Sequence, residues 1–236
     1  MRVLLVTATR FELVPFEDEL TPLERGNDKL ERFKWGDLQL DVLVCGIGMI
    51  SVTYKLTKIL LSNSYDCVIN AGIAGSYQKK LRIGTVVNVV KEQFSALGIE
   101  RTDSFQTLFE AGFLKPNQFP YHDGTLINPG FRYIHDIPEV NGITSNIIHL
   151  SEKKIQDIRQ KFNPDVESTE GAAVFYVCLQ QKIPFLQLRA ISNYVEDSDK
   201  CEWNIPLALE NLSLALFSVL NRLEPASKRN RETMPT

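Results

Sequence analysis

The stretch that decides the fold is TEGAAVFYVCLQQ (residues 169–181), followed closely by FLQLRAI (residues 185–191). The first segment is apolar on almost every side, which predicts a helix buried among other elements. The second is a largely apolar run that ends at the polar pair Ser192-Asn193, which predicts a buried strand. A buried helix that leads directly into a buried strand indicates an α/β protein with a central sheet.

The rest of the chain continues this alternation of strands and helices. Residues 33–38 and 40–45 predict a hairpin with its turn at Gly36-Asp37, and Ser151 is a typical helix cap. Further predicted strands are 2–7, 66–71, 85–91 and 140–150, predicted helices are 51–61, 152–161 and 206–223, and glycine turns are expected at 46–48, 72–75 and 84. We therefore expect one α/β domain over residues 1–224, with 225–236 as a disordered tail.

Composition narrows the classes of function. The chain has 236 residues and a net charge of −3, and its one basic cluster (residues 228–231) lies in the tail, so nucleic acid is not an expected partner. No apolar run is long enough to span a bilayer, and residues 1–6 do not resemble a signal peptide, so we expect a cytoplasmic protein without membrane contact. Neither the four cysteines (45, 67, 178 and 201) nor the three histidines (122, 135 and 149) have the spacing of a metal site, so no metal is expected.

One long segment breaks the pattern. Residues 98–129 carry several aromatic side chains and turn-forming residues without a clear period. A loop of this length inside a compact domain is commonly functional. We expect it to form a lid or a contact between subunits.

Polar residues at the ends of the two opening segments suggest a binding site. Glu170 would begin the buried helix, where the helix dipole alone can explain a glutamate, but a carboxylate there could also accept hydrogen bonds from ribose hydroxyls. Asn193 follows the predicted strand, where asparagine often forms a turn. A carboxamide can also face the N7 and O6 edge of a 6-oxopurine, with Ser192 orienting it or bonding the base.

Two charged residues extend this hypothesis. Glu12 follows the first strand and is interpreted either as a solvent-facing glutamate at a helix start or as a base that positions water. Arg189, in the interior of a strand, would be costly to bury without an anionic partner, and Glu12 is one candidate for that partner. Together these side chains predict a small-molecule site at the rim of the sheet, built to cleave an N-glycosidic bond.

In their residues and in their order along the chain, several segments resemble the purine nucleoside phosphorylase and nucleosidase superfamily, and within it the futalosine hydrolases. The resemblance covers most of the chain except the central segment and the tail. It rests on residues 4–12, 70–76, 167–173 with 175–178, and 189–193 leading into 203–208.

This resemblance implies a three-layer α/β/α sandwich with a central mixed sheet, and hydrolysis of futalosine to hypoxanthine and dehypoxanthinyl futalosine without a cofactor. It implies that Glu12 activates water, that Glu170 holds the ribose hydroxyls and that Asn193 assists the departing base. The nucleosidases of the methylthioadenosine type have aspartate in place of Asn193, so hypoxanthine is the expected leaving group. Family analogy also implies a homo-oligomer, a dimer or larger. The expected substrate-binding residues are Glu170, Thr169, Ser192, Arg189, Ile73 and Gly72.

The chain departs from the family pattern at two of these positions. Thr169 replaces a methionine that packs under the sugar, and Ile73 replaces a serine that helps to hold the nucleophile. Two other functions therefore stay open: a phosphorylase of 6-oxopurine nucleosides, and a nucleoside-binding protein without activity. A phosphorylase needs a phosphate pocket, for which Arg10, Arg82 and Arg189 are the candidates.

Overall fold

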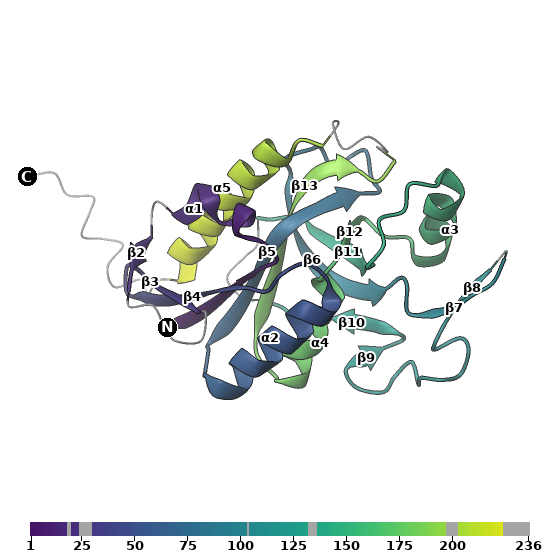
Figure 1. The fold of residues 1–236 in the computed structure, drawn as a ribbon, viewed down its shortest axis with the longest axis horizontal. Coiled ribbons are helices and arrows are strands. Elements are labelled where there is room, and N and C mark those ends of the chain that lie inside the picture. Colours follow the sequence, from purple (N-terminus) through teal and green to yellow (C-terminus); the bar gives the residue numbers. More distant parts are fainter. Residues whose placement is uncertain (18–19, 24–29, 103, 132–135, 197–202, 224–236) are drawn as a thin grey trace, which may run out of the picture.

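A computed structural model describes residues 1–17, 20–23, 30–102, 104–131, 136–196 and 203–223 (Figure 1). The expected tail (225–236), its basic cluster, Cys201 and His135 lie outside these residues. In chain order the strands are β1 (Arg2–Thr7), β2 (Thr21–Pro22), β3 (Glu31–Trp35), β4 (Leu38–Val44), β5 (Cys67–Ser76), β6 (Val86–Phe94), β7 (Gly98–Glu100), β8 (Phe105–Thr107), β9 (Tyr121–His122), β10 (Thr125–Ile127), β11 (Glu139–Thr144), β12 (Val166–Ser168) and β13 (Phe185–Tyr194). The helices are the short 3-10 turn η1 (Arg10–Glu12), α1 (Val14–Glu17), α2 (Met49–Ser62), α3 (Glu152–Phe162), α4 (Gly171–Gln180) and α5 (Ile205–Leu223).

Within the described residues, eleven strands form one mixed sheet, in which β1 pairs in parallel with both β4 and β5. The sheet closes on itself at one end, because β13 pairs in parallel with β5 and antiparallel with β6. The strands β5, β12, β11, β6 and β13 therefore form a closed circuit. This circuit brings segments from four distant parts of the sequence against one another.

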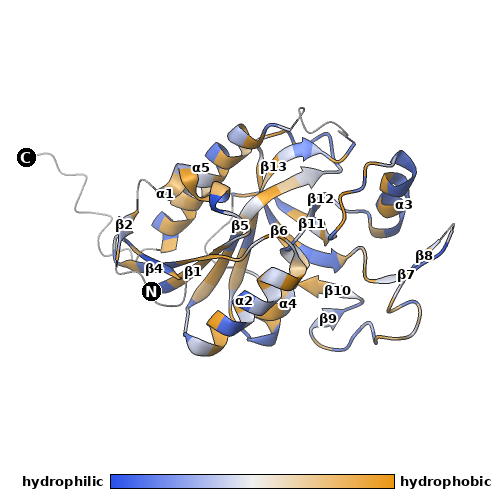
Figure 2. Ribbon diagram, viewed as in Figure 1, coloured by the Kyte–Doolittle hydropathy of each residue, from blue (hydrophilic) through white to orange (hydrophobic). Residues whose placement is uncertain are grey.

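Helices cover both faces of the sheet (Figure 1). On β1, Val3 and Leu5 face one core with α1 and α5, whereas Leu4 and Val6 face a second core with α2 and α4. This alternation follows from the two-residue period of a strand that is buried on both sides. Figure 2 shows hydrophobic and hydrophilic sides on α2 and α5, as expected for helices that cover a sheet. The expected three-layer α/β/α sandwich with a central mixed sheet is confirmed.

Several local expectations need correction. Residues 72–75 are not a turn, because β5 runs through them and pairs with both β12 and β13. Asn193 does not follow its strand but lies within β13, next to an irregularity in the pairing with β5. The strand expected at 140–150 ends at Thr144. The segment 98–129 is not a loop without structure, since it contains four short strands.

No helix in the described part of the chain is long and apolar enough to cross a membrane.

Candidate active site

A cavity of about 370 Å³ opens at the end of the sheet where β5 and β13 meet η1 and the start of α4. This volume lies within the range of roughly 300–1,000 Å³ that is usual for small-molecule sites. Six of the eight expected site residues line it: Glu12, Ile73, Thr169, Glu170, Ser192 and Asn193. Gly72 and Arg189 do not line the cavity and lie behind its wall.

Glu12 reaches the cavity from η1, directly after β1. Its Oε2 accepts hydrogen bonds from the backbone amide of Thr9 (2.6 Å) and from the hydroxyl of Thr9 (3.1 Å). The residue is only 6% exposed, so its interpretation as a solvent-facing glutamate is wrong. Burial raises the pKa of this carboxyl above its ordinary value, although both bonds from Thr9 and the charge of Arg189 oppose the rise.

Glu170 precedes the first residue of α4 and is its N-cap rather than a member of its first turn. One carboxylate oxygen, Oε1, accepts hydrogen bonds from the amide of Gly48 (2.7 Å) and from the hydroxyl of Thr169 (2.6 Å). Gly48 adopts a φ of 92°, which favours glycine and aims its amide at this oxygen. The other oxygen, Oε2, accepts no hydrogen bond from a described residue, so it is free to accept one from a ligand.

Asn193 has its carboxamide oriented by neighbours in β13. Its Oδ1 accepts a hydrogen bond from the hydroxyl of Ser192 (2.8 Å), and its Nδ2 donates to the carbonyl of Tyr194 (3.0 Å). Since Nδ2 carries two hydrogens, one remains for a ligand in the cavity. Ser192 therefore orients the amide, as one of its two expected roles requires.

Arg189 is fully buried behind the cavity, and its direct partner is not Glu12. Its Nη2 donates to Asn70 Oδ1 (2.6 Å) and its Nη1 to the carbonyl of Leu188 (3.0 Å). Burial lowers the pKa of the guanidinium, while the charges of Glu170, Glu92 and Glu12, in this order of effect, raise it. Arg189 is thus the cation shared by several buried carboxylates rather than half of one ion pair.

Gly72 separates Arg189 from Glu12. A Cβ atom at Gly72 would lie 3.4 Å from both Arg189 Nη1 and Glu12 Oε1. A Cβ at this distance would be in van der Waals contact with both groups, so the space between the guanidinium and the carboxylate is open only because residue 72 has no side chain. Gly72 therefore shapes the site from behind rather than touching its contents.

The sequence interpretation assigned no role to Glu167, which also lines the cavity. Its Oε2 accepts a hydrogen bond from the Tyr77 hydroxyl (2.9 Å), and burial raises the pKa of its carboxyl. The signal for it was present, because Glu167 lies in the same short motif as Glu170. The amide of Gly48 left no such signal, since backbone groups have no sequence pattern of their own.

Apolar side chains form the rest of the cavity. Phe11, Ile47, Ile147, Ile148 and Leu150 all line it, although each is at least half exposed. The described residues that line the cavity include no arginine, lysine or histidine. No group of three or more His, Cys, Asp or Glu in the described chain could hold a metal ion.

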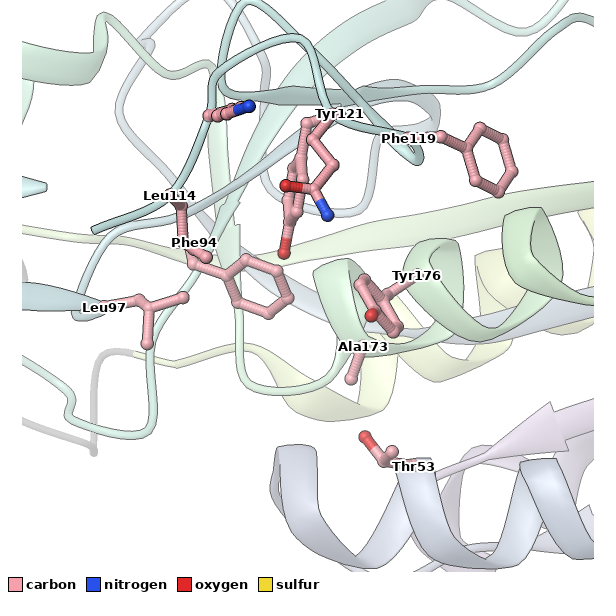
Figure 3. A pocket seen from close by; sticks show the side chains of 10 residues that line it. Thr53, Phe94, Leu97, Leu114, Phe119, Tyr121, Ala173 and Tyr176 are labelled. Atoms are coloured by element: carbon pink, nitrogen blue, oxygen red, sulfur yellow. The ribbon is translucent and has the colours of Figure 1, made fainter. Parts of the chain in front are cut away.

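The central segment lines a different cavity, of about 400 Å³, together with residues of α2, β6 and α4 (Figure 3). Figure 3 shows Phe94, Tyr121 and Tyr176 around this space, with Thr53 across from Ala173. Among the described residues of 98–129, none lines the cavity that contains the carboxylates. The segment does not cover that cavity in this structure, and its expected contact with another subunit stays a prediction.

Comparison with known proteins supplies the context for this geometry. The family model described as "Phosphorylase superfamily" matches residues 2–221. A 5'-methylthioadenosine/S-adenosylhomocysteine nucleosidase from Tolumonas auensis is 26% identical over 94% of this chain and 100% of its own length. A futalosine hydrolase from Streptomyces coelicolor is 26% identical over 78% of this chain and 80% of its own length.

Solved structures show the same fold at lower identity. The native structure of futalosine hydrolase of Helicobacter pylori strain 26695 has a TM-score of 0.77 at 17% identity, and the match covers 94% of this chain and 97% of that one. A 5'-methylthioadenosine/S-adenosylhomocysteine nucleosidase from S. pneumoniae with a transition-state inhibitor has a TM-score of 0.78 at 16% identity, covering 95% and 100%.

Proposed function

We propose, from the premise that the chain belongs to the phosphorylase superfamily, that it is a nucleosidase that hydrolyses the N-glycosidic bond of a 6-oxopurine nucleoside. Its substrate is futalosine, which yields hypoxanthine and dehypoxanthinyl futalosine. The observation that carries the proposal is one cavity that combines Glu12, Glu170 and Asn193 and has no basic side chain among its described lining residues.

Each of the three polar residues has a distinct role in this reaction. Cleavage passes through a sugar with oxocarbenium character, so groups that stabilise a cation and a departing base accelerate it. Glu12 accepts the proton of the water that attacks the anomeric carbon, and Oε2 of Glu170 accepts a hydrogen bond from the ribose. The free Nδ2 hydrogen of Asn193 donates to the base as electron density moves onto it.

The amide of Asn193 favours a 6-oxopurine. An amide cannot gain or lose a proton in the ordinary pH range, so its donor side faces N7 or O6. A neutral aspartic acid at this position would instead donate to N7 and leave a carbonyl oxygen for the 6-amino group of adenine. The futalosine hydrolase relatives support this substrate, while the methylthioadenosine nucleosidase relatives make the adenine nucleosides the alternative to test.

Hydrolysis is favoured over phosphorolysis because a phosphate needs several cationic or amide donors. Of the arginines considered for that task, Arg189 lies behind the cavity wall, and Arg10 pairs with Glu31 on the surface at 2.5 Å. Arg82 is not among the residues that line the cavity. Water is then the nucleophile that the site can accept.

We also propose a homo-oligomer, with the exposed face of α2 as part of the contact. Ile50, Tyr54 and Leu61 on this helix are 83%, 68% and 70% exposed and line one shallow groove. Apolar side chains gathered on one helix face are typical of a protein contact. Light scattering on the protein as it elutes from a size-exclusion column tests the proposed oligomer. A mass near 26.8 kDa, that of one chain, contradicts it.

The experiment that tests the function measures release of the purine base from futalosine, inosine and 5'-methylthioadenosine, each with and without phosphate. Release of hypoxanthine from futalosine without phosphate, with the other two substrates at least tenfold slower, supports the proposal. Release from inosine only when phosphate is added makes the protein a phosphorylase. Faster release of adenine than of hypoxanthine contradicts the base preference assigned to Asn193, and binding without any release supports a nucleoside-binding protein.

A further inference from the structure

A fourth carboxylate, Glu92 on β6, is buried beside β11, β13 and the start of α4 and takes no part in the proposed reaction. Its Oε1 accepts a hydrogen bond from Gln187 Nε2 (2.7 Å), and its Oε2 accepts one from the hydroxyl of Thr144 (2.9 Å). Burying a carboxylate costs more free energy than burying an apolar side chain of similar volume unless neighbouring groups donate hydrogen bonds to it. The donors to Glu92, Gln187 and Thr144, therefore indicate its role.

The space that Glu92 occupies explains two glycines. A Cβ atom at Gly171 would lie 2.1 Å from Glu92 Oε1, and one at Gly142 would lie 2.7 Å from the same oxygen. Gly171 is the first residue of α4, and its lack of a side chain leaves room beside Glu170. The room is filled from inside the protein by the carboxylate of Glu92 and the amide of Gln187.

A hydrogen-bond chain leads from Glu92 to the start of α4. The amide of Ala172 donates to Thr144 Oγ1 over 2.7 Å. The ionised carboxylate of Glu92 can only accept, so Thr144 donates its own hydrogen to Glu92 and accepts the Ala172 amide with a lone pair. This hydrogen-bond chain satisfies one of the unpaired amides in the first turn of α4, and the residue that precedes this helix is Glu170, its N-cap.

We infer that Glu92 is a positioning residue, which acts through Thr144 and the Ala172 amide to hold the N-terminus of α4, and thereby Glu170, in register with the cavity. The inference rests on the proposed function, because it assigns Glu170 to the ribose. Glu170 is then fixed from two sides: Gly48 and Thr169 hold its Oε1, and the Glu92 chain holds the backbone that follows it. Neither Glu92 nor Thr144 touches the substrate.

The test compares Thr144→Val, which removes the hydroxyl while keeping the shape, with Thr144→Ser, which keeps the hydroxyl. Thr7→Val is the matched control, because Thr7 is buried in β1 and its hydroxyl has no hydrogen-bond partner in the described structure. We expect Thr144→Val to lower kcat/KM for futalosine about tenfold, which corresponds to one lost hydrogen bond. Thr144→Ser should stay within threefold of the wild type, and Thr7→Val should leave the rate unchanged.

Measuring the same substitution in a Glu170→Gln protein distinguishes positioning of Glu170 from a general loss of packing. In Glu170→Gln protein, Thr144→Val should lower the residual kcat/KM less than twofold, because residues that act through one another are not additive. A penalty of the same size in both backgrounds overturns the inference. So does a Thr144→Val protein that is as active as the wild type.

Hydrogen exchange at the Ala172 amide gives a readout that does not need a substrate. We expect Thr144→Val and Glu92→Leu to speed exchange at this amide at least tenfold, and Glu92→Gln to speed it less because glutamine can still accept from Thr144. If wild-type protein releases no base from any nucleoside, the proposed function fails, while the exchange data still judge the hydrogen-bond chain. Unchanged exchange in Thr144→Val shows that the hydrogen-bond chain does not hold α4. If Glu92→Leu does not fold, the comparison of Thr144→Val with Thr144→Ser decides alone.

Discussion

The amide of Gly48 and the carboxylate of Glu170 are joined by a 2.7 Å hydrogen bond across 122 positions of sequence. The same oxygen accepts a hydrogen bond from the hydroxyl of Thr169, so Oε1 is occupied twice, whereas Oε2 accepts no hydrogen bond from a described residue. A carboxylate held in this way is oriented before a ligand arrives, and preorganisation of this kind lowers the cost of binding. The hydroxyl of Thr169 thus helps to orient the carboxylate of Glu170.

Replacing Thr169 with valine tests whether its hydroxyl anchors the carboxylate of Glu170. A hydrogen bond to a charged group contributes about 1.5–3 kcal/mol, and the Gly48 amide remains as a second anchor. We therefore expect Thr169→Val to lower kcat/KM for futalosine about tenfold, and Thr169→Ser to retain most of the activity. Steady-state kinetics on the three proteins measure the effect, and equal activity of the valine and wild-type proteins would refute the anchoring role.

The pH dependence of the reaction follows from Glu12. This carboxyl must be ionised to accept a proton from water, and burial raises its pKa above the ordinary 4.5. The rate should therefore fall on the acidic side, with the midpoint of the fall above pH 4.5. Glu12→Gln should lower kcat by about 100- to 10,000-fold.

Profiles of kcat/KM against pH measure this limb. Glu110→Gln is the control, because Glu110 is exposed, pairs with Lys161 at 2.7 Å and has a lowered pKa. The control should keep the limb where the wild type has it. A rate that stays flat down to pH 4 would rule out Glu12 as the base.

Asn193→Asp probes the choice of base. A neutral aspartic acid can donate to N7 and accept from a 6-amino group, whereas the amide suits the 6-oxo edge. We expect the ratio of kcat/KM for 5'-methylthioadenosine over futalosine to rise at least tenfold in the variant. Asn193→Ala, which loses donor and acceptor together, should slow both substrates without this change in ratio, and an unchanged ratio in Asn193→Asp would contradict the assignment.

The sequence was sufficient for the layers of the fold and for membership in the phosphorylase superfamily, which the family match over residues 2–221 confirms. Local periodicity predicts β1 and α2 because each buries its own pattern of side chains. The prediction that Glu12, Glu170 and Asn193 lie together at the rim of the sheet agrees with the structure, where all three line one cavity. Their chemical roles remain predictions.

What the sequence could not show depends on partners that are distant along the chain. Residues 72–75 look like a turn because glycine is common in turns. They form a strand because β12 and β13, which come much later in the sequence, pair with them. Gly171 leaves a space that Glu92 of β6 fills, and no local pattern shows which residue fills it. Arg189 was expected to have an anionic partner, with Glu12 as one candidate, and its direct side-chain partner is Asn70 on the neighbouring strand.

The last prediction concerns stability and Glu92. Burial raises the pKa of its carboxyl from 4.5 to about 7, although Arg189, Thr144 and Gln187 oppose the rise. The folded protein therefore holds this proton to a higher pH than the unfolded chain does. The stabilisation is fully present below pH 4.5 and is lost as the pH rises through about 7, because the unfolded state binds fewer protons in that window.

Glu92→Gln has no such proton, so the comparison isolates its effect. One unit of pKa corresponds to about 1.4 kcal/mol, and the free energy of unfolding of the wild type relative to Glu92→Gln should fall by about 3 kcal/mol between pH 4 and pH 8. Glu12 and Glu167 also have raised pKa values, but both proteins contain them, so their contributions largely cancel in the difference. Denaturant unfolding of both proteins at several pH values measures this difference. If the difference does not change with pH, the pKa of Glu92 is the same in the folded and unfolded states. Arg189, Thr144 and Gln187 then compensate fully for the effect of burial on that pKa.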